Sequence, residues 1–212
     1  MTSRSEILEE LRKAVSGKVK TNELVPEMPF FRPVEESLID SFKKAIENVG
    51  GRVTIVEDSN ELASAVSTLV KENGWKEIVC REDHIKQLLN VSEIVFECKR
   101  SLSEKTEAVI SGCEALIAGL GSVIVSSAQA GSRKMFVYPA AHIIVAQSSQ
   151  LVETLDEGME KTIARYAGGL PSMISIITGP SRTADIEKTL VLGAHGPKMV
   201  HVFIVNQDIF TK

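Results

Sequence analysis

The sequence has few aromatic residues, no concentration of positive charge and no long apolar run. Only 5% of its 212 residues are aromatic, the formal net charge is −4, and no block of Lys and Arg is interleaved with aromatics. A nucleic-acid-binding surface needs clustered positive charge, so we expect no nucleic-acid partner. No apolar run approaches the roughly 18 residues that span a bilayer, and the first residues are charged. We therefore expect a cytoplasmic protein without a membrane partner.

Cysteine is also scarce, and the common cofactor and nucleophile motifs are missing. Cys80, Cys98 and Cys113 are far apart, with no C-x-x-C pair. Zinc and iron–sulfur sites draw on closely spaced ligands, so we expect no metal and no cofactor on this chain. We interpret the three cysteines as small core or near-surface residues of a protein in a reducing compartment. The sequence contains no G-x-S-x-G, P-loop or G-x-G-x-x-G motif, which removes the usual support for those enzyme classes.

The chain does contain alternating short apolar runs and amphipathic stretches. This alternation predicts an α/β fold, with a mainly parallel sheet flanked by helices and an antiparallel hairpin insertion. The expected strands are 52–57, 76–81, 92–97, 106–110, 172–178 and 199–205. The expected helices are an N-terminal helix followed by a proline-containing arm at 17–33, then 34–49, 59–73, 83–89, 113–118, 154–166 and 185–190. The expected insertion consists of 121–127, 133–139 and 142–147, with a hairpin turn at 128–131.

The loop after the apolar run 173–177 is the first candidate ligand site. Its Gly179 allows close backbone approach, Ser181 supplies a hydroxyl, and Arg182 offers a planar fork for a carboxylate or phosphate. Thr178 and Thr183 add hydroxyls, and Asp185 stands at the expected start of a helix. Ligands of α/β sheets bind where strands end and helices begin, so these residues suit an anion site. An ordinary proline-containing turn with a helix cap explains them equally well.

The second candidate is the GAHGPK loop at 193–198. Its His195, followed by Gly196, could act as a general base or a donor near neutral pH, or could merely hydrogen-bond the backbone of a turn. The polar segment 126–131 could line a pocket, although the turn of a hairpin is polar in any case. The remaining three histidines are better explained as surface or packed residues.

The two loops stand in a longer pattern. The blocks T-G-P-S-R-T-A-D-I-E and L-G-x-H-G-P, together with ALIAGLGSVIVSS and YPAAHIIVAQSSQLVETLDEGM, resemble the LUD-domain family in its lactate-utilisation protein C branch. The resemblance covers most of residues 34–205. It implies a fold similar to the NagB/RpiA/CoA-transferase group, and an organisation into an N-terminal helix and arm at 1–33 and one LUD domain at 34–212.

The resemblance also implies a function. Proteins of this kind take part in bacterial L-lactate use, in which they accompany iron–sulfur subunits that together oxidise lactate to pyruvate. The resemblance does not supply a catalytic mechanism for this component. Because this chain lacks cluster-ligand spacing, we expect any iron–sulfur clusters to lie on the partners. Whether the chain forms a homo-oligomer is left open.

One position departs from the family pattern. Many relatives carry an acidic residue where this chain has Gly119, so a CoA-transferase-like mechanism that uses this acid is not expected here. Glu114 is close in sequence, but on the expected helix 113–118 it is interpreted as a solvated residue.

Three functions therefore remain. The chain is a component of a lactate-oxidising assembly that binds a small carboxylate or a partner; or it is a sugar-phosphate or CoA-ester binding enzyme; or it is a regulatory or scaffold protein whose loops are only structural. We expect the first.

Overall fold

The structure is a computed structural model that describes residues 36–89, 105–130, 133–166, 168–186, 189–192 and 196–206, together with Arg4, Leu8, Glu9, Arg12 and Leu102. The chain divides into two compact units, Met1–Arg32 and Pro33–Lys212. The expected N-terminal helix and arm, apart from these isolated positions, and the expected strand 92–97 lie outside the described residues. No helix in the described part of the chain is both long and apolar enough to cross a membrane.

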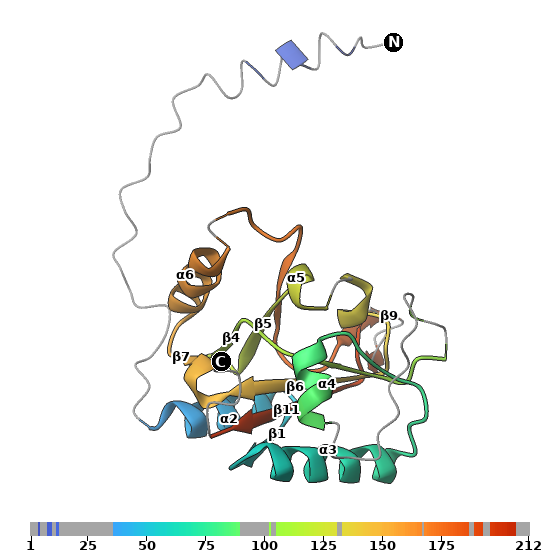
Figure 1. The fold of residues 1–212 in the computed structure, drawn as a ribbon. Coiled ribbons are helices and arrows are strands. Elements are labelled where there is room, and N and C mark those ends of the chain that lie inside the picture. The colour runs from blue at the N-terminus through green and yellow to red at the C-terminus, as the bar shows by residue number, and fades with distance from the viewer. Residues whose placement is uncertain are drawn as a thin grey trace. The chain divides into compact units, whose positions relative to one another are not determined.

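Five parallel strands form the central sheet of the second unit, in the order β1-β11-β6-β3-β2. They are β1 (Arg52–Val56), β2 (Ile78–Cys80), β3 (Ala108–Ser111), β6 (Ala141–Gln147) and β11 (Met199–Val205). Figure 1 shows β1, β11 and β6 of this sheet side by side. Every residue of β2, β3 and β6 is buried. Strands covered on both faces need apolar side chains at successive positions, which explains the short, continuous apolar runs of the sequence.

Helices α3 (Ser59–Asn73) and α4 (Asp83–Leu89) cover one face of this sheet. Asp58 begins α3 by accepting hydrogen bonds from the N–H groups of Asn60 and Glu61, at 2.8 and 2.9 Å. Gly74 ends it in the left-handed conformation, with φ +68°. The sequence predicted both helices, and the structure confirms them.

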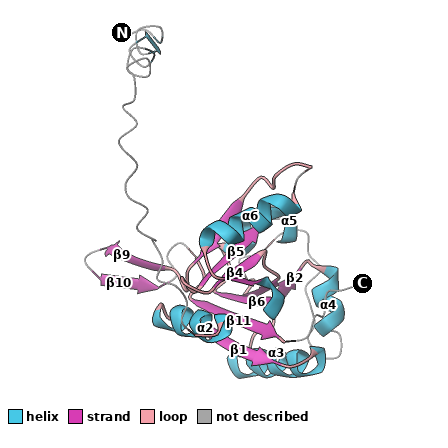
Figure 2. Cartoon of the chain, turned by 90° about the vertical axis from the view of Figure 1, so that its left-hand side faces the viewer, coloured by secondary structure: helices cyan, strands magenta, loops and turns pink. Residues whose placement is uncertain are grey.

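The opposite face of the sheet packs against α2 (Leu38–Asn48) and against a second sheet (Figure 2). The second sheet has the order β7-β4-β5-β8, in which β5 is antiparallel to both of its neighbours. Helix α6 (Leu155–Arg165) packs against the outer side of this sheet. The strands of the second sheet are β4 (Ala115–Ile117), β5 (Ser122–Ser126), β7 (Leu151–Val152) and β8 (Ile174–Ile177).

Four expected elements are wrong, and the segment 142–147, expected in the antiparallel insertion, is instead part of β6 in the parallel sheet. The expected helix 113–118 is strand β4, which forms a hairpin with β5. The expected strand 133–139 is a short 3-10 helix, η1 (Arg133–Phe136), and the expected turn before it is α5 (Ser127–Ala130). A second 3-10 helix, η2 (Ser148–Gln150), follows β6.

The expected helix 185–190 is a separate hairpin of β9 (Arg182–Ile186) and β10 (Thr189–Leu192). The fold class itself is confirmed, because a mainly parallel sheet with flanking helices carries an antiparallel addition.

Candidate functional site

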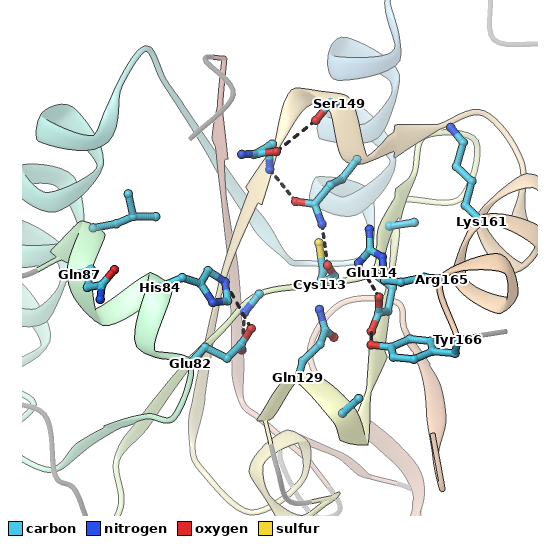
Figure 3. A pocket seen from close by; sticks show the side chains of 16 residues that line it. Glu82, His84, Gln87, Cys113, Glu114, Gln129, Ser149, Lys161, Arg165 and Tyr166 are labelled. Atoms are coloured by element: carbon cyan, nitrogen blue, oxygen red, sulfur yellow. Dashed lines mark hydrogen bonds and ion pairs between the residues drawn. The ribbon is translucent and has the colours of Figure 1, made fainter. Parts of the chain in front are cut away.

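A cavity of about 990 Å³ opens at the carboxyl ends of three parallel strands (Figure 3). Glu82 follows β2, Gly112 to Glu114 follow β3, and Gln147 ends β6. Helix α6 adds Lys161 and Arg165 to the lining. This edge of an α/β sheet is where loops diverge and ligands bind, and the cavity has the size of a small-molecule site.

Glu114 is the centre of a buried polar cluster in this cavity. Its side chain is 0% exposed, and its Oε2 accepts a hydrogen bond from Arg165 Nη1 at 2.7 Å. Its Oε1 accepts from Ser126 Oγ and from the Tyr166 hydroxyl, both at 2.6 Å. Burial, followed by the hydrogen bond to Glu114, raises the pKa of Tyr166, which therefore stays a donor. The interpretation of Glu114 as a solvated helix residue is wrong, because residue 114 enters a buried strand.

Glu82 is the second buried carboxyl group and lies in a different environment. Its Oε1 accepts from the Gly112 N–H at 2.8 Å, and its Oε2 lies 3.7 Å from His84 Nε2. Burial raises the pKa of Glu82, the Gly112 N–H lowers it by less, and the charge of Glu114 raises it further. Burial also lowers the pKa of His84, so this ring favours the neutral form. Burial therefore favours the protonated form of Glu82, whereas Glu114 forms an ion pair with Arg165.

Two carboxyl groups in such different environments can divide the work of acid and base. A carboxyl group that keeps its proton can donate a hydrogen bond or a proton, whereas an ion-paired carboxylate holds cations and donors in place. In this cavity Glu82 is the candidate acid. Glu114 is the anchor for Arg165 and Tyr166.

Four glutamines line the same cavity, and hydrogen bonds hold the amide groups of three of them. Gln129 Oε1 accepts from the Ser126 N–H at 3.0 Å, and Gln150 Oε1 accepts from the Gln147 N–H at 2.8 Å. Gln150 Nε2 donates to the Cys113 carbonyl at 2.6 Å. Gln147 is 5% exposed, and its Nε2 has no hydrogen-bond partner. A buried donor without a partner destabilises the fold by about 1–3 kcal/mol, so a ligand that supplied an acceptor to Gln147 Nε2 would be stabilising.

The structure brings together parts of the two loops that the sequence singled out. The Ser181 N–H donates to the Pro197 carbonyl at 2.9 Å, and Gly196 lies against the Ser181 side chain. Thr178 Oγ1 is 2.8 Å from Ser122 Oγ, which ties the first loop to β5. His195 lies outside the described residues. The 178–182 and 196–198 segments are thus neighbours, and neither lines the cavity.

The remaining residues of the first loop have structural roles. Gly179 has φ +77°, a conformation that favours glycine. The exposed Arg182 donates from Nη2 to the Val49 carbonyl at 2.7 Å, and so covers the end of α2. Thr183 and Asp185 lie in strand β9, so Asp185 does not begin a helix. The loop also follows β8, a strand of the mixed sheet, and not a strand of the parallel sheet on which the expectation was based.

Sequence reasoning missed the cavity, although a signal for it was present. Glu82 directly follows the expected strand 76–81, and Gln147 ends the expected strand 142–147. Glu114 stands four residues after the expected strand 106–110, inside the expected helix 113–118. The rule that ligands bind at the carboxyl ends of parallel strands applies to these residues. The polar segment 126–131 did include a lining residue, Gln129.

The described cysteines do not form a reactive or metal-binding group. Cys80 and Cys113 are free and buried, and burial is the main cause that raises the pKa of each thiol, to about 12 for Cys80. Cys113 lines the cavity but is only 2% exposed. Among the side chains that the structure describes, no three His, Cys, Asp or Glu groups come together as metal ligands.

Comparison with known proteins places this architecture in a family. A protein named lactate utilization protein C from Deinococcus radiodurans is 28% identical over 206 residues, which cover 94% of each chain. The uncharacterized protein YkgG of Escherichia coli is 25% identical over 96% of this chain and 99% of its own length. A crystal structure of a DUF162 family protein from D. radiodurans covers 80% of this chain and 96% of that chain, with a TM-score of 0.60 and 24% identity, and so has the same fold. The LUD domain profile matches residues 39–205, and this chain therefore belongs to the LUD domain family.

Proposed function

We propose that this chain is a component of a bacterial L-lactate utilisation system, in which lactate is oxidised to pyruvate together with iron–sulfur partner proteins. The observation that carries the proposal is the match to lactate utilization protein C of D. radiodurans over 94% of both chains. A second protein of that name, from Bacillus subtilis, is 31% identical over 106 residues, which cover 49% of this chain. Matching over nearly full length means that the cavity and its supporting strands fall inside the aligned region.

The iron–sulfur clusters of the proposed assembly belong to the partners. Cluster ligands converge on one centre, whereas Cys80 and Cys113 are buried in different hydrophobic clusters. The contribution of this chain is then a ligand-binding cavity and a surface for the partners. The cavity supports a role in ligand binding, because its walls combine two carboxyl groups, two cations and several amides.

The experiment that tests the proposal is disruption of the gene, followed by growth with L-lactate as the only carbon source. The expected result is loss of growth on lactate with unchanged growth on glucose, and recovery when the intact gene is returned. A tagged copy of the chain is expected to co-purify iron–sulfur proteins, recognised by their visible absorbance and iron content. Normal growth on lactate together with the absence of such partners would remove the proposal.

A second candidate function uses the 178–185 and 193–198 loops to bind a sugar phosphate or a CoA ester. The observation in its favour is the contact of Ser181 with Gly196 and Pro197, which makes the two loops neighbours. Arg182 would supply the cation. Calorimetry with ribose 5-phosphate and with acetyl-CoA tests this candidate. It requires binding to the intact chain that Arg182→Ala removes.

A further inference from the structure

Most acceptor oxygens of the cavity are already occupied by internal hydrogen bonds. Gln129 Oε1 accepts from the Ser126 N–H, and Gln150 Oε1 accepts from the Gln147 N–H. Gln147 Oε1 accepts from Ser149 Oγ at 3.2 Å. Both oxygens of Glu114 accept hydrogen bonds, as does Glu82 Oε1. These contacts fix the orientation of each amide and direct its nitrogen away from the occupied side.

Donors are what remains for a ligand. Gln147 Nε2 is buried and has no partner. Gln129 Nε2 lies beside Gly112, 3.7 Å from where a β-carbon on that glycine would stand. Burial raises the pKa of the Glu82 carboxyl group, which favours its protonated form and therefore an O–H donor. An acceptor-rich ligand would satisfy these groups, whereas a ligand made of donors would leave them unpaired.

The α6 side of the cavity supplies positive charge. Arg165 uses Nη1 on Glu114, its side chain is 54% exposed, and the guanidinium carries further donors. Lys161, one turn earlier on the helix, also lines the cavity and pairs with Glu157, a glutamate outside the lining. Arg165 matches the charge of Glu114, and Lys161 is the second cation of the cavity wall.

We propose that this cavity binds an organic acid, with its carboxylate toward Arg165 and Lys161 and a neighbouring oxo or hydroxyl oxygen toward the amides of Gln147 and Gln129. The ligand class is therefore a 2-oxo or 2-hydroxy carboxylate. The donor pattern alone selects an acceptor-rich anion. The choice of a 2-oxo or 2-hydroxy acid among such anions rests on the proposed function.

The volume of the cavity limits the size of the acid that can bind. A cavity of about 990 Å³ lies at the upper end of the range for small-molecule sites. A three-carbon acid fills a small part of it, and acids of five or six carbons also fit. The probes are therefore L-lactate, pyruvate, 2-oxoglutarate and citrate, with lactamide as an uncharged match of lactate.

Calorimetric titration of the full-length chain at pH 7 tests the proposal. At least one acid is expected to bind in the micromolar to low millimolar range, and lactamide at least tenfold more weakly than lactate. Gln147→Leu is expected to weaken binding at least tenfold, because it removes the unpaired donor and keeps the size of the side chain. Gln129→Leu, at a half-buried position, gives a second variant should the first fail to fold. Lys44→Gln, on α2 and away from the cavity, is the control and is expected to bind as the intact chain does.

Absence of binding for all four acids would overturn the proposal. So would equal binding of lactate and lactamide, or a loss of binding on Arg182→Ala but not on Gln147→Leu, which would move the site to the 178–185 loop. The result is separable from the growth experiment. A growth defect without acid binding contradicts this inference alone, and acid binding without a growth defect contradicts the proposed function alone.

Discussion

At the scale of single residues, Glu82 and Glu114 show how the surroundings of a carboxyl group determine its role. Glu114 receives hydrogen bonds from an arginine, a tyrosine and a serine. Glu82 receives one from the Gly112 N–H, and burial outweighs it. The same residue type thus provides an anchor in one place and a carboxyl group with a raised pKa in the other.

Replacing Glu82 should change how stability depends on pH. Its raised pKa means that the folded chain holds this proton to a higher pH than the unfolded chain, whose value is near 4.5. The contribution of Glu82 to stability is therefore fully present below that value and is lost as pH rises through the folded pKa. Glu82→Gln removes this loss, so the free energy of unfolding of the variant relative to the intact chain should rise between pH 4 and pH 8 in urea titrations.

Glu107 provides the opposite control for that measurement. The N–H groups of Lys76 and Glu77 lower its pKa, so its contribution is present above the usual carboxyl range and is lost as pH falls. Glu107→Gln should therefore lose relative stability as pH rises toward 4.5, so its urea titrations extend to lower pH than those of Glu82→Gln. Slopes of the same sign for Glu82→Gln and Glu107→Gln would contradict a raised pKa for Glu82.

Replacing Glu114 should destabilise the fold at any pH near neutrality. Glu114→Gln removes the charge that holds Arg165 and turns one accepting oxygen into a donor that faces Tyr166, Ser126 or Arg165. The expected decrease in the free energy of unfolding is about 2–4 kcal/mol, because buried donors are left mispaired. Glu157→Gln is the matched control: its ion pair with Lys161 is exposed on the same helix, so the loss should stay below about 1 kcal/mol. Urea unfolding measures both, and similar losses would argue against a buried anchor.

At the scale of elements, packing of the β4–β5 turn onto α2 depends on one glycine. Gly121 has φ +61°, and a β-carbon there would overlap the backbone of Ala45 and Ile46. Gly121→Ala should therefore lower the free energy of unfolding by about 3–5 kcal/mol, from the strained conformation and the forced movement of the helix. Gly74→Ala is the control, since Gly74 has a similar φ of +68° and open space around it.

The control isolates the conformational cost. Without a steric clash, Gly74→Ala should lose only about 1–2 kcal/mol. Thermal unfolding of the two variants gives the comparison directly. If both lost the same amount, the contact between the turn and α2 would have no energetic weight.

Elements whose ends are marked by capping residues could be predicted from the sequence, and elements without such residues could not. Helix α3 has an aspartate that accepts from two N–H groups at its start and a glycine at its end, and both were legible in the sequence. The segment 113–118 is buried at every position, so no periodicity separates a short strand from a short helix. The hairpin of β9 and β10 has Asp185 inside a strand, where a cap was expected.

The candidate site shows the same limit. A loop such as 178–185 concentrates its polar residues in one stretch, so it can be recognised from the sequence alone. The cavity takes Glu82, Glu114, Gln129, Gln147 and Arg165 from five separate segments. Their convergence depends on the strand order β6-β3-β2 and on the packing of α6, which no local pattern encodes.

At the scale of the whole molecule, the two faces of the parallel sheet share the same strands. Val79 faces the cluster formed with α2 and the second sheet, while its neighbours Ile78 and Cys80 face the cluster formed with α3 and α4. Residues of β3, β6 and β11 are divided between the two clusters in the same way. Since neither cluster can separate from the sheet without exposing strand residues of the other, we expect the described part of the second unit to unfold as one cooperative unit.

The two buried thiols measure this cooperativity, because Cys80 lies in one cluster and Cys113 in the other. Each thiol has a raised pKa and is at most 2% exposed, so labelling near pH 8 requires opening of the fold. In a Cys98→Ser background, a thiol reagent followed by peptide mass spectrometry should modify Cys80 and Cys113 at rates within about twofold of each other, and both rates should rise together with urea. A Cys113 that reacted more than tenfold faster than Cys80 without denaturant would mean that the cavity wall opens independently of the sheet. In that case the donors proposed to hold an organic acid would belong to a segment that opens locally. A saturating concentration of the acid should then slow the labelling of Cys113 and leave the labelling rate of Cys80 unchanged.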